Sequence, residues 1–316
     1  MNIGMTATKR SVLVTSVLSP LGLCRWLLLF AFCLAGFVWS PTACAQVTYQ
    51  LLKSFGTPGT GGYPVAGLLQ GSDGALYGTA QSGGSLGNGT VFKLNPDGTG
   101  FTVLKNFDSS TTGGYPQAGL LQGTDGALYG TASQGGSLGY GTVFKLNPNG
   151  TGFTVLKNFD YSTTGGYLYA GLLQGSDGAL YGTAYQGGSL GYGTVFKLNP
   201  DGTGFTVLKF LHGPDLTASG GYPQAGLLKG TDGALYGTAS QGGSLGYGTV
   251  FKLNPDGTGF TVLKNFDNST TGGYLHAGLL QGTDGALYGT AYQGGSSGVG
   301  TVFRLVLSSG TVYSIR

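Results

Sequence analysis

Carboxylates are the first residues to consider for catalysis, because the sequence has twelve acidic side chains and all of them are Asp. Most fall into sets that occupy equivalent places in a repeated unit. One set is Asp73, Asp125, Asp177, Asp232 and Asp284, a second is Asp97, Asp201 and Asp256, and a third is Asp108, Asp160 and Asp267. A glycoside hydrolase needs an acid and a carboxylate in different environments, whereas equivalent Asp residues in equivalent turns are typical of turn caps. Only Asp215 has no counterpart, so an Asp-dependent hydrolase or lyase would have to use it.

Histidine and cysteine offer little for a metal site or a nucleophile. His212 and His276 lie in different units at positions that do not correspond, and all three Cys precede residue 46. Metal sites and catalytic triads require such side chains together with partners. The Asn-Pro-Asp-Gly turns and the Gly-rich loops also lack the spacing of calcium-binding and phosphate-binding loops. We therefore expect no catalytic residue, no cofactor and no metal.

Tyrosine offers a different chemistry, because its ring is an apolar plate that carries a hydroxyl group. Three positions of the repeated unit vary among the copies. They hold Gln117, Tyr169, Gln224 and His276 at the first, Asn88, Tyr140, Tyr192, Tyr247 and Val299 at the second, and Gln81, Ser133, Tyr185, Ser240 and Tyr292 at the third. A surface of this composition suits a neutral, hydroxyl-rich ligand or a protein partner. The predicted ligand-binding residues are Tyr140, Tyr192, Tyr247, Tyr185, Tyr292, Tyr169 and His276; the competing interpretation is that these side chains only fill the surface.

These residues must be positioned by the repeated unit itself. Its five Gly-Gly-Tyr tyrosines are spaced by 52, 52, 55 and 52 residues, at Tyr63, Tyr115, Tyr167, Tyr222 and Tyr274. In the second copy we expect strands over residues 117–122, 127–132, 142–147 and 153–159, separated by an Asp-Gly turn, a Gly-rich loop and an Asn-Pro-Asn-Gly turn. In such a meander the loops after the second and fourth strands share one face. The variable positions and the insertion at residues 211–215 fall on that face.

The predicted fold is an all-β propeller of five four-stranded blades, because several strands are apolar on both sides and stacked blades cover both faces. The segment Tyr49–Phe55 is a copy of the fourth strand that stands before the first full unit, so it could close the last blade and remove exposed edges. The segment Thr311–Arg316 could instead be the fourth strand of the last blade. An open ring, or one completed in a dimer, stays an alternative.

The core DGALYGTA is present five times and is followed by GTVFKLN, which reads GTVFRLV in the last copy. This core resembles the GloVer (Gloeo/Verruco) tandem repeat of the choice-of-anchor tandem repeat proteins. The resemblance covers about residues 47–316, and a more distant one links the unit to the propeller repeats of two-component regulators. It implies export and a β-propeller but no known activity. Members often end in an apolar helix with a basic tail. This chain stops at residues 310–316 without one, so release is expected rather than surface anchoring.

The first 45 residues have the features of a signal peptide. Basic residues precede an apolar run over residues 26–39, and a cleavage site follows that ends at Ala45. A lipoprotein signal using Cys44 and an uncleaved anchor are the alternatives. Three of the fifteen basic residues lie in this segment, which leaves twelve against twelve Asp. Residues 46–316 are therefore predicted to form one neutral propeller domain that is not embedded in a membrane, and no basic surface remains for nucleic acid.

The predicted protein is a secreted, non-catalytic binding module that holds a glycan or a cell-surface or extracellular protein on the variable loop face. A purely structural or adhesive repeat protein is the second hypothesis, and the Asp215 hydrolase or lyase is the third. The composition does not predict an oligomeric state.

Overall fold

The structure is a computed structural model that describes residues 47–56, 58–213 and 219–307. The chain divides into the units Met1–Tyr49 and Gln50–Arg316, and the fold described below belongs to the second. The predicted signal peptide, Cys44, Asp215 and the predicted strand Thr311–Arg316 lie outside the described residues. Within the described residues, no helix has the length and apolar character needed to cross a membrane.

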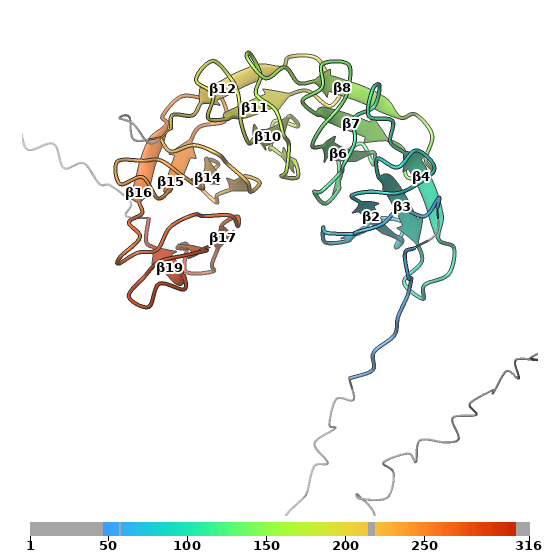
Figure 1. Cartoon of the computed structure of the whole chain (residues 1–316), viewed down its shortest axis with the longest axis horizontal. Coiled ribbons are helices and arrows are strands. Elements are labelled where there is room, and N and C mark those ends of the chain that lie inside the picture. The colour runs from blue at the N-terminus through green and yellow to red at the C-terminus, as the bar shows by residue number, and fades with distance from the viewer. Residues whose placement is uncertain (1–46, 57, 214–218, 308–316) are drawn as a thin grey trace, which may run out of the picture. The chain divides into compact units, whose positions relative to one another are not determined.

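Five antiparallel sheets follow one another in chain order (Figure 1). Four of them have four strands and the fifth has three among the described residues. The strands are, sheet by sheet, β1 (Leu69–Gln70), β2 (Leu76–Ala80), β3 (Thr90–Leu94) and β4 (Thr102–Asn106); β5 (Leu121–Gln122), β6 (Leu128–Ala132), β7 (Thr142–Leu146) and β8 (Thr154–Asn158); β9 (Leu173–Gln174), β10 (Leu180–Ala184), β11 (Thr194–Leu198) and β12 (Thr206–Phe210); β13 (Leu228–Lys229), β14 (Leu235–Ala239), β15 (Thr249–Leu253) and β16 (Thr261–Asn265); and β17 (Leu280–Gln281), β18 (Leu287–Ala291) and β19 (Thr301–Leu305). The all-β propeller prediction is confirmed.

The turn residues explain why the strands begin and end where they do. Between β5 and β6, Gly126 adopts a φ of 79°, which few other residues tolerate, and its N–H donates to the carbonyl of Gly123 at 2.9 Å. The side chain of Asp125 accepts the N–H of Ala127 at 3.1 Å. The same turn recurs in every sheet, so the predicted capping role of this set of Asp residues is confirmed.

The core lies between successive sheets. Tyr77 and Val91 of the first sheet pack with Leu128 and Phe144 of the second, and all four are almost completely buried. Equivalent clusters join the later sheets. Fully burying a Leu, Val or Phe side chain contributes roughly 1.5–3 kcal/mol, so each junction of this kind supplies a large part of the stability of a blade. Both faces of an interior sheet are covered, as the strands without alternation predict.

Two hydrogen bonds recur across each junction between sheets. The hydroxyl of Thr79 on β2 donates to the carbonyl of Ala118 in the next unit at 2.9 Å. In the opposite direction, the N–H of Tyr115 donates to the carbonyl of Asn88 at 2.8 Å. Both bonds are present at all four junctions inside the chain. Each blade is therefore held to the next by polar contacts as well as by the core.

One prediction about the strands needs correction. The first strand of the second unit was expected over residues 117–122, but only Leu121–Gln122 pair with β6, because Tyr115 has a φ of 56° and Gly119 lies against the carbonyl of Gly67 in the preceding unit. The fifth sheet has three strands among the described residues, and the predicted fourth strand Thr311–Arg316 lies outside them.

Candidate binding surface

The loops that follow the second and fourth strands of the second and third sheets bring tyrosines together. These loops cover residues 133–141, 159–172, 185–193 and 211–227, with residues 214–218 not described. They are held by glycines: the N–H of Gly188 donates to the carbonyl of Tyr161 at 2.7 Å, and Gly187 has a φ of 78°. Glycine is needed at that position because a side chain at Gly187 would collide with the Tyr161 backbone. The loops are therefore built to a fixed shape.

We call seven neighbouring tyrosines the tyrosine cluster: Tyr140, Tyr161, Tyr167, Tyr169, Tyr185, Tyr192 and Tyr222. Ring contacts join them in two groups, Tyr140 with Tyr161 and Tyr167, and Tyr169 with Tyr185, Tyr222 and Tyr192. Electrostatic interactions of Tyr167 with Tyr169 and of Tyr161 with Tyr222 link the two groups. Tyr185 links its own unit to the next, because its ring centroid lies 5.1 Å from that of Tyr169 and 5.3 Å from that of Tyr222. Tyr222 in turn lies 5.6 Å from Tyr192 in a T-shaped arrangement. These distances are those of interacting aromatic pairs, worth about 0.5–1.5 kcal/mol each beyond buried area.

Tyr140 anchors the other end of the cluster. Its ring centroid lies 5.3 Å from that of Tyr161 and 5.9 Å from that of Tyr167. Tyr161 is 38% exposed, and the other six rings are partly exposed. The cluster is therefore neither core nor free surface: its rings are supported by one another and remain accessible.

The backbone of the Gly-Gly-Tyr tyrosines fixes the position of the cluster. Tyr167 and Tyr222 have φ values of 60° and 59°, a left-handed conformation that costs a residue with a side chain roughly 1–2 kcal/mol. It is held by the bonds from the N–H of Tyr167 to the carbonyl of Tyr140 and from the N–H of Tyr222 to the carbonyl of Tyr192, at 2.9 and 2.8 Å. The predicted site residues Tyr140 and Tyr192 are thus tied by main chain and by ring to the next unit.

The electrostatics of the cluster are set by its tyrosines and by one nearby carboxylate. Burial, followed by the neighbouring Tyr185 and Tyr167, raises the pKa of Tyr169 above its ordinary value. Burial also raises the pKa of Tyr222, with Tyr192, Tyr185 and Tyr161 as further causes. The described loop residues include no Lys or Arg. The carboxylate of Asp160 already accepts bonds from Ser162 and Thr163. The surface therefore presents tyrosine hydroxyls and ring faces, with the Asp160 carboxylate as the one acidic side chain of these described loops.

The remaining predicted site residues lie in two smaller groups that no described ring contact joins to the cluster. Tyr247 makes a T-shaped pair with Tyr274, whose centroid is 5.9 Å away. His276 stacks on Tyr292 at 5.0 Å and 19°, and burial lowers the pKa of His276. Both His276 and Tyr292 are exposed. The seven predicted residues thus fall into three places, and their role as a binding site stays a prediction.

Sequence reasoning missed Tyr161, Tyr167 and Tyr222. Tyr167 and Tyr222 belong to the Gly-Gly-Tyr motif, which is identical in all five units, so variation among the units could not single them out. Tyr161 replaces Ser109 and Asn268 of other units, so comparison of the units could have singled it out. A second signal was available: Tyr169 and Tyr185 are sixteen residues apart, as are His276 and Tyr292, and each pair is in contact.

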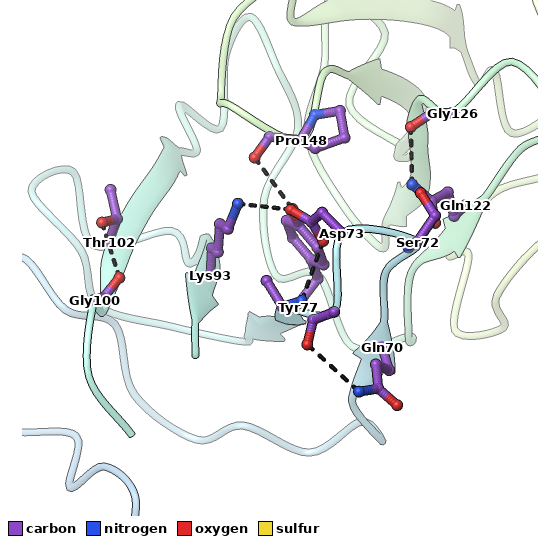
Figure 2. A network of polar contacts seen from close by, with 12 residues as sticks. Gln70, Ser72, Asp73, Tyr77, Lys93, Gly100, Thr102, Gln122, Gly126 and Pro148 are labelled. Atoms are coloured by element: carbon purple, nitrogen blue, oxygen red, sulfur yellow. Dashed lines mark hydrogen bonds and ion pairs between the residues drawn. The ribbon is translucent and has the colours of Figure 1, made fainter. Parts of the chain in front are cut away.

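The opposite face carries a repeated polar network instead. In the first sheet, the carboxylate of Asp73 accepts the hydroxyl of Tyr77 at 2.7 Å and pairs with Lys93 at 2.8 Å, while the Tyr77 hydroxyl faces the carbonyl of Pro148 at 3.5 Å (Figure 2). The hydrogen bonds from Lys93 and Tyr77 lower the pKa of Asp73 to about 2. The same carboxylate, tyrosine and cation recur in all five sheets.

This network is structural in character. The carboxylates are equivalent, each is already paired, and the Tyr hydroxyl bridges it to the core. Among the residues that the structure describes, no three His, Cys, Asp or Glu side chains are grouped so that they could hold a metal ion. The tyrosine cluster and its two smaller neighbours are therefore the candidate binding surface, because their side chains are not used in this network.

Comparison with solved structures gives distant likenesses of fold. The crystal structure of a nidogen/laminin complex matches with 18% identity and a TM-score of 0.47, over 72% of this chain and 72% of that chain. The extracellular domain of a hybrid two-component system from B. thetaiotaomicron matches with 12% identity and a TM-score of 0.49, over 77% of this chain and 27% of that one. A gluconolactonase from Xanthomonas campestris matches with 17% identity and a TM-score of 0.45, over 81% and 79%. No curated protein gives a significant match.

The repeat itself is matched by a family model. The Gloeobacter/Verrucomicrobia repeat matches residues 35–218 and 173–315, two overlapping regions that together include all five sheets. The resemblance proposed from the DGALYGTA and GTVFKLN cores is therefore confirmed. The chain belongs to the family of proteins built from the Gloeobacter/Verrucomicrobia repeat.

Proposed function

We propose that this chain is a secreted, non-catalytic binding module that holds a neutral glycan on the tyrosine cluster. The observation that carries the proposal is the run of interacting, partly exposed rings from Tyr169 through Tyr185 and Tyr222 to Tyr192. Sugar rings present apolar C–H faces and hydroxyl edges, and tyrosine offers a counterpart to both. The described loops contain the Asp160 carboxylate and no Lys or Arg, which favours a neutral ligand over an anionic one.

Preorganisation supports the same conclusion. The rings are held by glycine-shaped loops and by main-chain bonds between units, so little conformational entropy would be lost when a ligand binds. In the described loops of the cluster, the bonds that Asp160 accepts from Ser162 and Thr163 lower its pKa and make it a poor general acid or base, which supports binding rather than catalysis. Export, through the predicted signal peptide, would place the surface in contact with extracellular polysaccharide.

The test is binding of the exported full chain to immobilised neutral oligosaccharides derived from β-glucan, α-glucan, xylan and mannan, with polygalacturonate as an anionic comparison. The strongest neutral binder is then titrated by calorimetry against the double variant Tyr169→Ala and Tyr185→Ala. We expect at least about a tenfold loss of affinity, because about 1.4 kcal/mol corresponds to a factor of ten and two stacking rings are removed.

The control is Tyr247→Ala, which removes a tyrosine pair that no described ring contact joins to Tyr169 or Tyr185. It should bind as the unaltered chain does, with unchanged circular dichroism for all variants. An equal loss in Tyr247→Ala would place the site elsewhere. A folded chain that binds none of the neutral oligosaccharides would refute the glycan proposal and leave a protein partner as the candidate for this face.

A further inference from the structure

Each of the four junctions between successive sheets is made by the same hydrogen-bonding groups. The groups at the two ends of the chain that have no described junction can therefore be identified. A Thr hydroxyl on the second strand of one sheet donates forward to an Ala carbonyl of the next unit. A Gly-Gly-Tyr N–H of the next unit donates back to a loop carbonyl. Because five copies form only four described junctions, the groups at the two ends make no such bond within the described chain. They are the Thr290 hydroxyl and the Val299 carbonyl in the last unit, and the Tyr63 N–H and the Ala66 carbonyl in the first.

The unused parts of the fifth sheet are exposed. Val302 on β19 is 81% exposed, whereas its counterparts Val91, Val143, Val195 and Val250 are 0% exposed. Val299 is 83% exposed, and Thr290 and Leu280 are also exposed. In the interior sheets the same positions form the face that packs against the next sheet. The fifth sheet therefore exposes the residues that pack against the next sheet in the interior sheets, and no described residue covers them.

The first sheet presents the complementary half. Tyr63 is 75% exposed, and Val65 and Leu68 are exposed as well. Against this sheet lies the segment Gln50–Phe55, which imitates the fourth strand of a preceding blade. Such a segment would be expected to pair along its other edge with a third strand, and no described strand of the chain does so.

The imitation extends to individual contacts. The ring of Phe55 lies 5.1 Å from that of Phe92, as that of Phe107 lies 5.1 Å from Phe144 in the next sheet. The amine of Lys53 lies 4.4 Å from the Phe101 ring centre. The corresponding distance from Lys105 to Phe153 is 4.2 Å. Gly98 lies against Leu52 as Gly150 lies against Leu104. Gln50–Phe55 thus packs against the first sheet as the fourth strand of a preceding sheet would, although no described sheet precedes it.

We propose that the end of one chain binds the beginning of a second copy, head to tail, through this fifth junction. In the complex, Gln50–Phe55 of the second copy adds to the edge of β19 as a fourth strand, and its first sheet covers Val302. The Thr290 hydroxyl would then donate to the carbonyl of Ala66, and the Tyr63 N–H to the carbonyl of Val299. The occupant is identified by the four internal junctions, each of which shows which surface covers this face.

A second copy is favoured over closure within one chain because both halves of the junction are exposed in the same chain. The contact is heterologous, since different surfaces meet, so association can continue from copy to copy. The balance of twelve Asp against twelve basic residues after residue 45 leaves little net repulsion to oppose it. This proposal is independent of the binding function of the tyrosine cluster.

The internal junctions also supply a cross-linking test. The Cβ of Asn88 lies 3.2 Å from where a Cβ on Gly114 would be, close to the spacing that a disulfide needs. The equivalent leftover pair is Val299 and Gly62, and a Cβ on Gly62 would meet only the Ser82 hydroxyl, at 3.6 Å. We would export and purify Gly62→Cys and Val299→Cys as separate full chains. Mixing them under mild oxidation should give a covalent dimer containing one chain of each kind.

Two controls make the result specific. Mixing Leu138→Cys with Val299→Cys measures random collision, since Leu138 is exposed in a loop of the second unit, and we expect at least about tenfold less dimer there. The double variant Asn88→Cys with Gly114→Cys should form its disulfide within one chain. Light scattering should show association of the unaltered chain that Val302→Lys weakens about tenfold or more, because it would bury an unpaired charge.

Three results would overturn the proposal. The first is a Gly62–Val299 mixture that gives no more dimer than the Leu138 control. The second is a chain that stays monomeric at the highest concentration reached. The third is a doubly substituted Gly62→Cys, Val299→Cys chain that forms its disulfide within one molecule while dilute, which would show that the chain closes on itself.

Discussion

The hydroxyl of Thr131 offers a direct test of how the sheets are held together. It is 1% exposed and donates to the carbonyl of Ala170 in the next unit at 3.0 Å. Thr131→Val keeps the branched shape that suits a strand and removes only the donor. The matched control lies in the same chain, because Thr290 is the equivalent residue of the fifth sheet and is exposed. Thr290→Val therefore removes the same group without breaking a bond inside the described chain.

The expected cost follows from the bond and its burial. A hydrogen bond within a protein contributes about 0.5–1.5 kcal/mol net, and leaving a buried acceptor without a donor costs about 1–3 kcal/mol. The carbonyl of Ala170 loses the Thr131 donor, while the added methyl recovers part of the loss through burial. We expect Thr131→Val to lower the free energy of unfolding by about 1–2 kcal/mol, and Thr290→Val to change it by less than about 0.5 kcal/mol in dilute solution.

The measurement is unfolding in urea, followed by tyrosine fluorescence and by circular dichroism. The two substitutions can be compared if both probes give the same unfolding transition and if the slope of the unfolding free energy against urea concentration is unchanged. Equal effects of the two substitutions would mean that the bond between sheets is not the cause of the loss. A negligible effect of Thr131→Val would mean that water or relaxation replaces the bond, and the argument from the four conserved contacts would fail.

Two further predictions concern stability. Hydrogen bonds lower the pKa of Asp73 and of Asp284 from 3.8 to about 2. The largest contribution comes from Lys93 and Arg304 respectively, and the next from Tyr77 and Tyr288. The two carboxylates therefore stabilise the fold fully above about pH 4, and this stabilisation is lost as the pH falls towards 2. Asp73→Asn should accordingly destabilise the chain at pH 7 and make little difference at pH 2, as measured by thermal unfolding; an unchanged deficit at pH 2 would contradict this. Gly130→Ala should cost about 1–3 kcal/mol in urea unfolding, because the new methyl would collide with the buried Phe144 ring and Leu120, and a neutral result would show that the core can relax.

The sequence was sufficient for the repeat, the strands and their order, because turn residues and β-branched runs act locally. Asp125-Gly126 and the TVFKL run of β7 specify a turn and a strand without reference to distant parts. The extent of the first strand in each unit was not predictable in this way. Its length is limited by the left-handed backbone of Tyr115 and by the approach of Gly119 to the neighbouring unit, both of which arise from contact between blades.

The candidate site was predicted in part for the same reason. Variation among the copies pointed to Tyr169 and Tyr185, and they are in contact. It could not point to Tyr222, which is identical in kind to Tyr63, Tyr115, Tyr167 and Tyr274. Tyr222 joins the cluster only because Tyr185 and Tyr192 of the preceding unit lie beside it. Tyr167 is the equivalent of Tyr222 one unit earlier. The unit before it has Ser133 in place of Tyr185, so only the Tyr140 ring of that unit contacts Tyr167. Its environment depends on three-dimensional neighbours that differ from copy to copy.

The two proposed surfaces make different uses of the same repetition. Identical junctions favour addition of further copies, because the exposed fifth sheet of any copy matches the exposed first sheet of any other. The tyrosine cluster instead depends on differences between units, since Tyr161, Tyr169 and Tyr185 occur together only in the third. One chain therefore carries one such cluster, and binding at it would be no stronger than the contacts of a few rings allow. Head-to-tail association would place many clusters on one particle, so that a polymeric glycan could engage several at once and be held far more tightly than by a single chain.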